Sequence, residues 1–342
     1  MPGRLRVDRS FRLEGQRGVV SRTPVVHGGR VFQVFVHDRG DWLQSRLLCF
    51  DAGTLELQWE HVEDDALLNA MISRDGRLLC ARMTGTATVL AFDPLTGDRA
   101  WTWTGDDEGT GVLSEDVGGR VVLAGVGDAG TSWCLDSATG EALWSFGNGD
   151  QPHSTAASEG RLFLTTERRL NALDAATGSL LWTRTEEASY LFQPAVVGGV
   201  VVVGGHGLLD FHDPADGALL ARVSTGRPRA AIYAIAVRGN TLWFGDSQGH
   251  VCCYEVTVSD GVSAVQRWTH TCAGAAVGMP AVVGDRVYVT DDARKLTALD
   301  AASGEPLAQV GIRGRARSTG VTADGSALFV AAERNLLRIV GS

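Results

Sequence analysis

Apolar residues in this sequence occur in short runs that alternate with glycine-containing turns along nearly the whole chain. Residues 196–203 are typical, because two apolar runs flank the pair Gly198-Gly199. Short apolar runs bounded by Gly, Asn or Asp predict β-strands joined by tight turns. The richest apolar window, residues 194–209, is itself broken by glycines, so no stretch approaches the roughly 18 apolar residues of a transmembrane helix. The pattern predicts an all-β protein without a membrane-spanning segment.

An aspartate motif recurs at nearly constant intervals. In its complete form an aspartate is followed four residues later by a glycine and four residues after that by a tryptophan. Complete copies begin at Asp93, Asp136 and Asp174, and altered copies begin at Asp51, Asp213, Glu255 and Asp300. The seven anchors are 38 to 45 residues apart. A period of about 40–50 residues is typical of the blades of a β-propeller.

Each anchor motif predicts a tight turn between two strands. The aspartate carboxylate can accept backbone N–H groups in an Asx-turn, and the glycine provides the positive φ that ends the turn. The tryptophan follows on the next strand, where we expect it to pack one blade against its neighbour. The alternative, a ring of metal-binding aspartates, is not expected, and no metal site is predicted.

Glycine-containing turns also mark a second hairpin upstream of each anchor. Eight such turns stand against seven anchors, and the last of them, at Asp324-Gly325, is followed by only one more strand, residues 335–340. The outer strand missing from this last blade can come from residues 5–13, which form an unassigned strand. A ring closed in this way leaves no strongly exposed edge and ties the two termini together.

The sequence therefore predicts an all-β fold: a single eight-bladed β-propeller of four-stranded antiparallel blades, closed by the N-terminal strand. We expect one domain, residues 1–342, although a chain of 342 residues would suggest about two domains from length alone. The expected blades are residues 21–63, 68–106, 112–148, 153–186, 191–225, 231–271, 278–312 and 317–342, with the closing strand at residues 4–14.

Composition and charge narrow the function classes. The chain has 43 glycines, about 12.6% against a usual background of about 7%, as many turns require. Its formal net charge is −9, whereas nucleic-acid binders usually carry basic patches, so nucleic acid is not an expected partner. The N-terminal residues show no apolar run like that of a signal peptide. With six cysteines and no such signal, we expect a cytoplasmic protein with free thiols.

The segment from Leu173-Asp174 through Thr177-Gly178 to the trailing Trp182 resembles the quinoprotein-type, or PQQ-like, repeat, and the resemblance covers essentially the whole chain. One branch of that family, the quinoprotein alcohol dehydrogenases, implies PQQ with calcium and a disulfide between adjacent cysteines. Cys252-Cys253 are adjacent here, but Cys253 occupies a slot that holds small residues in other blades, among them Cys49 and Cys134. Cysteine acts as a small hydrophobe in such a slot. We therefore expect neither PQQ nor calcium.

A second branch contains the propeller subunit of the bacterial outer-membrane β-barrel assembly machine, which is similar in length and blade number. This resemblance implies a bacterial, non-catalytic interaction platform. That subunit is an exported lipoprotein, whereas this sequence shows neither an export signal nor an N-terminal lipidation cysteine. Its location and partners therefore do not carry over.

The expected loops between blades differ in charge. Residues 61–65, 106–108 and 186–187 are acidic, whereas Arg227 and Arg229 follow blade five, and Arg313, Arg315 and Arg317 follow blade seven. A rim polarised in this way could steer a charged partner, and guanidinium groups bind carboxylates or phosphates well. We take these five arginines as candidate binding residues. The alternative is that the loops are only solvated.

Several polar residues are candidates for chemistry. His212 breaks the repeat in an apolar slot, and rule-breaking positions are enriched at functional sites. His206 on the preceding loop could join it as a metal site or an acid–base pair, and the alternative is a hydrogen-bonded core histidine. His153, near Asp150, and Tyr190 are the other catalytic candidates. Asn69 and Gln193, where first strands begin, are candidate ligand-lining residues together with Tyr190.

No catalytic sequence motif was found. We therefore expect a non-catalytic cytoplasmic scaffold that binds a protein or peptide, with a small charged ligand as a further candidate and without nucleic acid or membrane contact. The alternative is a small-molecule or enzymatic site in the central funnel, and the enzyme question stays open with the weight against it. A PQQ-dependent enzyme is the third hypothesis, and it is not expected.

Overall fold

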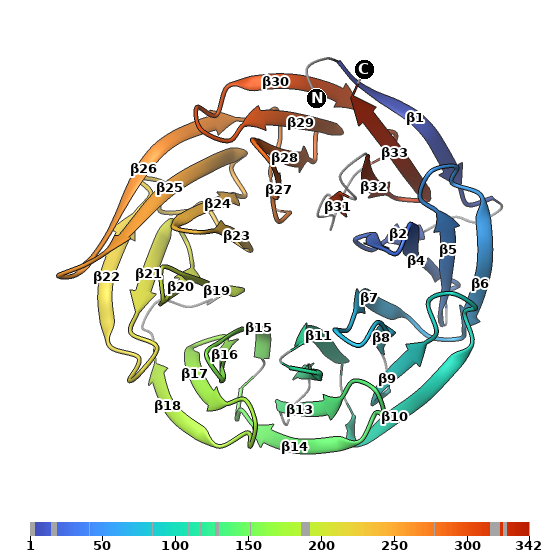
Figure 1. The fold of residues 1–342 in the computed structure, drawn as a ribbon, viewed down its shortest axis with the longest axis horizontal. Helices are drawn as coiled ribbons and strands as arrows, with labels where there is room; N and C mark the ends of the chain where they lie inside the picture. The colour runs from blue at the N-terminus through green and yellow to red at the C-terminus, as the bar shows by residue number, and fades with distance from the viewer. Residues whose placement is uncertain are drawn as a thin grey trace.

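The computed structural model describes residues 4–14, 19–40, 42–83, 85–108, 110–116, 118–126, 130–150, 152–185, 192–276, 278–314, 322–323 and 327–341. In this part of the chain, eight antiparallel sheets follow one another around a central axis (Figure 1). Each sheet is one blade, whose first strand lies nearest the axis and whose fourth strand lies at the rim. The predicted eight-bladed all-β propeller is confirmed.

The blades are numbered in chain order. Blade one contains β2 (Val19–Ser21), β3 (Val25–His27), β4 (Arg30–Asp38), β5 (Leu43–Asp51) and β6 (Leu57–Glu63), and blade two contains β7 (Leu67–Ile72), β8 (Leu78–Arg82), β9 (Thr86–Phe92) and β10 (Arg99–Glu108). Blade three contains β11 (Thr110–Asp116), β12 (Arg120–Val126), β13 (Thr131–Asp136) and β14 (Ala142–Gly147), and blade four contains β15 (Pro152–Ser158), β16 (Arg161–Thr166), β17 (Arg169–Asp174) and β18 (Leu180–Thr185). In blade one, β2 and β3 share the inner position, because both pair with β4.

Blade five contains β19 (Pro194–Val197), β20 (Val200–Gly204), β21 (Leu208–His212) and β22 (Leu219–Ser224), and blade six contains β23 (Ile235–Arg238), β24 (Thr241–Gly245), β25 (His250–Val258) and β26 (Val262–Thr271). Blade seven contains β27 (Ala281–Val283), β28 (Arg286–Asp291), β29 (Lys295–Asp300) and β30 (Pro306–Gly311), and blade eight contains β31 (Thr322–Ala323), β32 (Leu328–Ala332), β33 (Asn335–Gly341) and β1 (Leu5–Arg12).

The aspartate motifs form the expected turns between the third and fourth strands. In blade four, Asp174 Oδ1 accepts the N–H groups of Ala176 at 3.0 Å and Thr177 at 2.8 Å, and Gly178 has a φ of 71°. The same two bonds form at Asp51, Asp93, Asp136 and Asp300. Because each turn is built on its own carboxylate, it forms in the same way in different blades.

The glycine of the turn also receives the tryptophan of the preceding blade. A Cβ atom on Gly178 would lie 2.6 Å from Cδ2 of Trp144, so only glycine lets the indole approach this closely. Trp144 Nε1 donates to Ala175 O across the interface at 3.2 Å. Equivalent bonds join Trp59 to Pro94, Trp101 to Ser137, Trp182 to Pro214 and Trp268 to Ala301. The predicted packing role of the tryptophans is confirmed.

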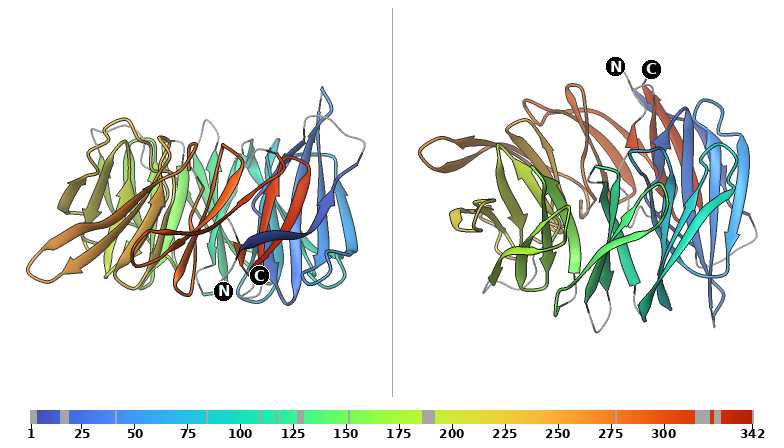
Figure 2. Two further views of the ribbon diagram at one scale, coloured as in Figure 1. Left: turned by 90° about the horizontal axis from the view of Figure 1, so that it is seen from above. Right: turned by 60° about the horizontal axis from the view of Figure 1, so that its bottom comes forward.

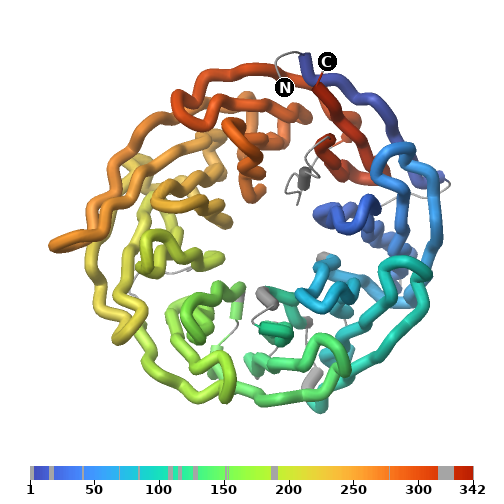
Figure 3. Tube along the Cα trace, in the orientation of Figure 1, coloured from blue at the N-terminus to red at the C-terminus, as the bar shows by residue number. Residues whose placement is uncertain are grey.

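The N-terminal strand completes blade eight. β1 pairs with β33 through seven residue pairs, and the two strands lie side by side in Figures 1 and 3. The Phe11 ring lies 4.7 Å from the ring of Phe50 in blade one. Arg338 forms an ion pair with Asp8 and donates to Ala52 O at 2.8 Å. The predicted closure is confirmed, and it also joins blade eight to blade one.

The two faces of the disc carry different connections. The loops between blades and those between second and third strands, such as residues 225–234 and 246–249, lie on one face, which we call the loop face. The remaining hairpins, such as residues 239–240 and 301–305, lie on the opposite face, which we call the anchor face. Figure 2 shows the disc from the side, with the β25–β26 hairpin reaching beyond its rim. Among the described residues no helix is long and apolar enough to cross a membrane.

Candidate functional site

Four residues singled out from the sequence meet on the loop face between blades five and six. Gln193 precedes β19, His206 lies in the β20–β21 loop, and Arg227 and Arg229 lie in the loop that leads into blade six. An isolated antiparallel β-bridge between His206 and Ala231 joins the β20–β21 loop to the loop that leads into blade six. We call the surface formed by residues 192–193, 205–207 and 225–234 the five–six junction.

Two aromatic residues without any motif in the sequence complete this junction. The Phe192 ring lies 4.6 Å from the ring of Tyr233 and 6.0 Å from that of His206. Tyr233 is 41% exposed, and His206 and Arg229 are exposed as well. Tyrosine and arginine are enriched among the residues that dominate protein interfaces. The only sequence signal for Tyr233 was an aromatic residue in a loop, which is too common to single out.

The backbone of the five–six junction is extensively hydrogen-bonded. Gly207 N donates to Ala230 O at 2.8 Å, and Thr225 N donates to Gly207 O at 2.9 Å. Ser247 of blade six accepts the N–H of Ala231 at 2.9 Å. A Cβ atom at Gly207 would lie 2.2 Å from Arg227 O, so glycine is needed for the two loops to approach. The side chains at this junction are therefore carried by loops that are bonded to one another.

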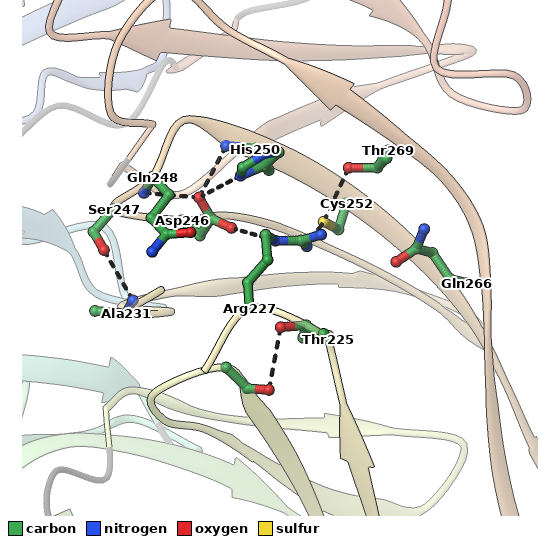
Figure 4. A network of polar contacts seen from close by, with 12 residues as sticks. Thr225, Arg227, Ala231, Asp246, Ser247, Gln248, His250, Cys252, Gln266 and Thr269 are labelled. Atoms are coloured by element: carbon green, nitrogen blue, oxygen red, sulfur yellow. Dashed lines mark hydrogen bonds and ion pairs between the residues drawn. The ribbon is translucent and has the colours of Figure 1, made fainter. Parts of the chain in front are cut away.

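Arg227 is partly buried and is bound by residues of blade six (Figure 4). Its Nε donates to Asp246 Oδ2 at 3.0 Å, and its Nη2 donates to Cys252 Sγ at 2.8 Å. Asp246 is fully buried, and its Oδ1 accepts the backbone N–H groups of Gln248 and His250, each at 2.9 Å. A buried carboxylate needs such partners, because desolvating an unpaired charge is costly. In this structure Arg227 fixes the loop that carries Tyr233.

The other histidine candidates lie apart from this junction. His212 is 1% exposed at the anchor-face end of β21, where its Nδ1 lies 3.1 Å from Gly217 O. His206 lies at the loop-face end of the same hairpin, so the structure does not bring the two rings together. Asn69 and His153 lie in β7 and β15, each within a β-bulge near the loop-face end of the strand.

Of the remaining arginine candidates, Arg313 lies in another part of the ring. Arg313 is exposed after β30, and its carbonyl accepts the Asn335 side-chain amide at 3.0 Å. Arg315, Arg317 and Tyr190 lie outside the described residues. The arginines therefore do not form one described cluster.

The acidic loop after blade one is partly neutralised by its neighbour. Glu63 is 7% exposed and forms ion pairs with Arg82 and, at 3.0 Å, with Arg99. A hydrogen bond from His61, together with the two arginines, lowers the pKa of Glu63. This carboxylate therefore joins blade one to blade two, a contact that the charge pattern of the sequence did not indicate.

The adjacent cysteines do not fit the PQQ site that the family resemblance implies. All six cysteines are free. Cys252 packs in the core between blades five and six, and Cys253 packs on the opposite face of β25, toward blade seven. Burial raises the pKa of Cys253 to about 12. No group of three or more His, Cys, Asp or Glu residues suited to a metal ion occurs in the described part of the chain.

The ring of eight blades, with its aspartate turns and docked tryptophans, defines an eight-bladed propeller of PQQ-like repeats. A family model described as "Outer membrane protein assembly factor BamB" matches residues 8–132, 128–209 and 205–307, and the chain belongs to this family. No curated protein matches the chain.

Three solved structures illustrate the likeness in fold. BamB from Moraxella catarrhalis has 16% identity and a TM-score of 0.70, over 98% of this chain and 99% of that one. The computationally designed Ika8 protein has 15% identity and a TM-score of 0.76, over 97% and 98%. The quinohemoprotein alcohol dehydrogenase ADHIIG from Pseudomonas putida HK5 has 15% identity and a TM-score of 0.69, over 99% and 77%. At such identities the likeness concerns the fold alone.

Proposed function

We propose that the protein is a non-catalytic cytoplasmic scaffold that binds a protein or peptide partner through the five–six junction. The observation that carries this proposal is the exposed Tyr233, packed against Phe192 on loops that are hydrogen-bonded to each other. An aromatic side chain on a preorganised loop loses little conformational entropy on binding. Arg229 and His206, which are exposed on the same junction, add polar groups around Tyr233.

Family membership and cysteine chemistry support the proposal. The family is described as an assembly factor, which favours a role with protein partners. Six free cysteines favour a reducing compartment, since disulfides are rare in the cytosol. Because Cys252 and Cys253 belong to separate cores, the scaffold is proposed to work without PQQ, calcium or another cofactor.

The test removes the exposed Tyr233 together with Arg229 and compares this variant with one in which a matched aromatic–arginine pair elsewhere on the loop face is removed. The variant is Tyr233→Ala with Arg229→Ala. The control is Trp42→Ala with Arg39→Ala, because Trp42 is 47% exposed and Arg39 lies over its ring at 5.8 Å. Partners captured from an extract of the source cells are identified, purified and titrated against the three proteins by calorimetry.

We expect the junction variant to bind its partner at least about 30-fold more weakly, which corresponds to a hot-spot loss of about 2 kcal/mol. The control variant should bind like the unmodified chain. Equal losses in both variants, or unchanged binding in the junction variant, would contradict the proposal. Small-molecule binding that depends on Asn69 or His153 would instead support the alternative of a ligand site in the central funnel.

A further inference from the structure

A second feature lies on the anchor face, where blade six departs from the repeat. In four blades an arginine begins the second strand, directly opposite the anchor aspartate of the third. These pairs are Arg30–Asp51, Arg120–Asp136, Arg161–Asp174 and Arg286–Asp300. In blade six the same register places Thr241 opposite Glu255. The anchor is still acidic, but its arginine has been replaced by a much shorter side chain.

Blade three shows what the arginine does at this position. The N–H of Thr139 is the largest influence that lowers the pKa of Asp136, and the charge of Arg120 adds to it. The hydrogen bond from the hydroxyl of Thr177 is the largest influence that lowers the pKa of Asp174, the anchor of blade four. The charge of Arg120 again adds to this lowering. One guanidinium therefore acts on the anchor of its own blade and on that of the next.

Between blades six and seven the corresponding place is a pocket of about 870 Å³, open to the anchor face. Its wall includes Thr241, Glu255 and Asp300, which are the threonine and the two anchors of the motif described above. Asp285 from the first hairpin of blade seven adds a third carboxylate. The pocket thus lies where Thr241 is too short to reach from one anchor toward the other.

The two arginines in the wall already have partners inside the protein. Arg267 forms an ion pair with Glu255. Arg238 donates to the carbonyl of Gly284 and lies 5.6 Å above the Trp243 ring. Asp285 forms an ion pair with Arg286 of blade seven at 3.6 Å, so Asp300 is the one carboxylate of the wall without an ion pair among the described residues. The pocket therefore favours a cationic ligand over an anionic one.

A buried donor in the same wall adds an independent sign of a ligand. Trp243 lines the pocket and is only 2% exposed, and its Nε1–H has no hydrogen-bond acceptor among the described residues. An unsatisfied buried donor costs about 1–3 kcal/mol, and buried tryptophan N–H groups usually find a partner. An oxygen acceptor carried by a ligand would satisfy it.

We propose that this pocket binds the guanidinium group of an arginine, either free or within a peptide. The bound guanidinium lies between Glu255 and Asp300, beside Thr241, which stands where an arginine begins the second strand in four other blades. The planar fork of N–H donors matches two carboxylates better than an ammonium group does. A carbonyl or carboxylate oxygen of the same ligand accepts the Trp243 N–H. This site is on the face opposite the five–six junction and is independent of the proposed function.

The test titrates the purified protein with arginine, agmatine, lysine and an arginine residue capped at both ends, using calorimetry. Arginine or its capped form should bind at least tenfold more tightly than lysine. Agmatine has no carboxylate or carbonyl acceptor and should bind more weakly than arginine. Preference for the capped form assigns the site to a peptide segment, and preference for free arginine assigns it to a metabolite. Tighter binding of lysine, or no binding of any arginine-bearing probe at millimolar concentration, would overturn the proposal.

Two substitutions at one position separate filling the pocket from disturbing it. Thr241→Arg restores the arginine of the repeat and should abolish binding, whereas Thr241→Val keeps the volume of the side chain and should leave binding unchanged. Asp300→Asn, which retains an oxygen for the turn, should weaken binding tenfold or more and serves if Thr241→Arg does not fold. Unchanged affinity in the folded Thr241→Arg protein, or in Asp300→Asn, would refute the assignment.

A reverse experiment creates the pocket elsewhere. Arg120→Thr removes the guanidinium whose charge contributes to lowering the pKa of the anchors of blades three and four. Agmatine should then raise the unfolding temperature of this variant more than that of the unmodified protein, because the added guanidinium replaces the missing one. An equal shift in both proteins would count against the idea that this place in the repeat is a guanidinium site.

Discussion

His37 lies at the loop-face end of β4 and is 1% exposed, and neither ring nitrogen has a hydrogen-bond partner among the described residues. Burial lowers its pKa from 6.5 to about 4, and the nearby charges of Arg39 and Arg46 contribute in the same direction. The folded protein therefore keeps this imidazole neutral at pH values where the unfolded chain binds a proton.

This histidine should make stability depend on pH. Between pH 6.5 and about 4 the unfolded state binds more protons at this site, so stability falls as the pH falls, by up to about 3 kcal/mol. His37→Phe should remove this part of the dependence in urea titrations at several pH values. The exposed His27 provides the control, and His27→Gln should retain the slope of the unmodified protein. An unchanged slope in His37→Phe would show that the buried imidazole is not its source.

The sequence was informative for residues whose role is local. Cys49, Cys134 and Cys253 were predicted as small core residues from their place in the repeat, and all three are buried. The sequence placed residues 61–65 in an acidic rim, but it did not reveal that Arg82 and Arg99 of the next blade form ion pairs with Glu63. The repeat pattern predicts the tryptophan contacts between blades, but an ion pair such as this one involves residues outside the repeat motif.

At the scale of elements, the anchor turn combines two requirements at one glycine. Gly178 has a positive φ, and it also lies against Trp144 of the preceding blade. The first requirement was predicted from the turn pattern. The second, a close approach between blades, is why a glycine rather than an asparagine suits the end of these turns.

Alanine substitutions at two glycines of blade four should separate the requirement for a positive φ from the requirement for a close approach between blades. Gly160→Ala places alanine at a φ of 74° in open space, whereas Gly178→Ala places it at a φ of 71° against the indole. Both should lose about 1–2 kcal/mol from the backbone, and Gly178→Ala should lose about 1–3 kcal/mol more from overpacking. Urea unfolding of both variants measures the difference.

A double substitution checks the origin of that difference. In a Trp144→Ala background, Gly178→Ala should cost no more than Gly160→Ala, because the indole is gone. If the excess cost of Gly178→Ala persists without Trp144, the contact between the blades does not explain it.

At the scale of the whole molecule, one strand from the start of the chain holds the ring closed. β1 covers the edge of β33, and Leu5 and Leu13 are 7% and 2% exposed at this joint. Without β1, an edge strand would be exposed, and such edges promote aggregation.

Deleting residues 1–13 should therefore destabilise the protein by at least about 3–6 kcal/mol, the burial contribution of Leu5 and Leu13 alone. The same deletion should promote self-association, measured by light scattering. A peptide of residues 4–14 added in trans should restore the unfolding temperature, and deleting only residues 1–3 is the control. A truncated protein as stable as the full chain would mean that the joint contributes little.

The architecture could be predicted because it is repeated. Seven anchors and eight upstream turns report the number of blades, and the unmatched eighth hairpin indicates how the ring closes. The sequence did not predict the five–six junction as one site. Gln193 was singled out as a ligand-lining residue, His206 as a partner of His212, and Arg227 and Arg229 for their charge. Phe192 and Tyr233 were missed, because their proximity depends on how two blades dock.

The sequence by itself determined the fold, since turns built from an aspartate and a glycine are local and strand patterns are periodic. Only the tertiary structure decided which charged groups form ion pairs within the protein. Arg227 is bound to the buried Asp246, and Glu63 is bound by two arginines of the next blade. The pocket beside Thr241 was likewise visible only in the tertiary structure, because residues of blades six and seven line it together.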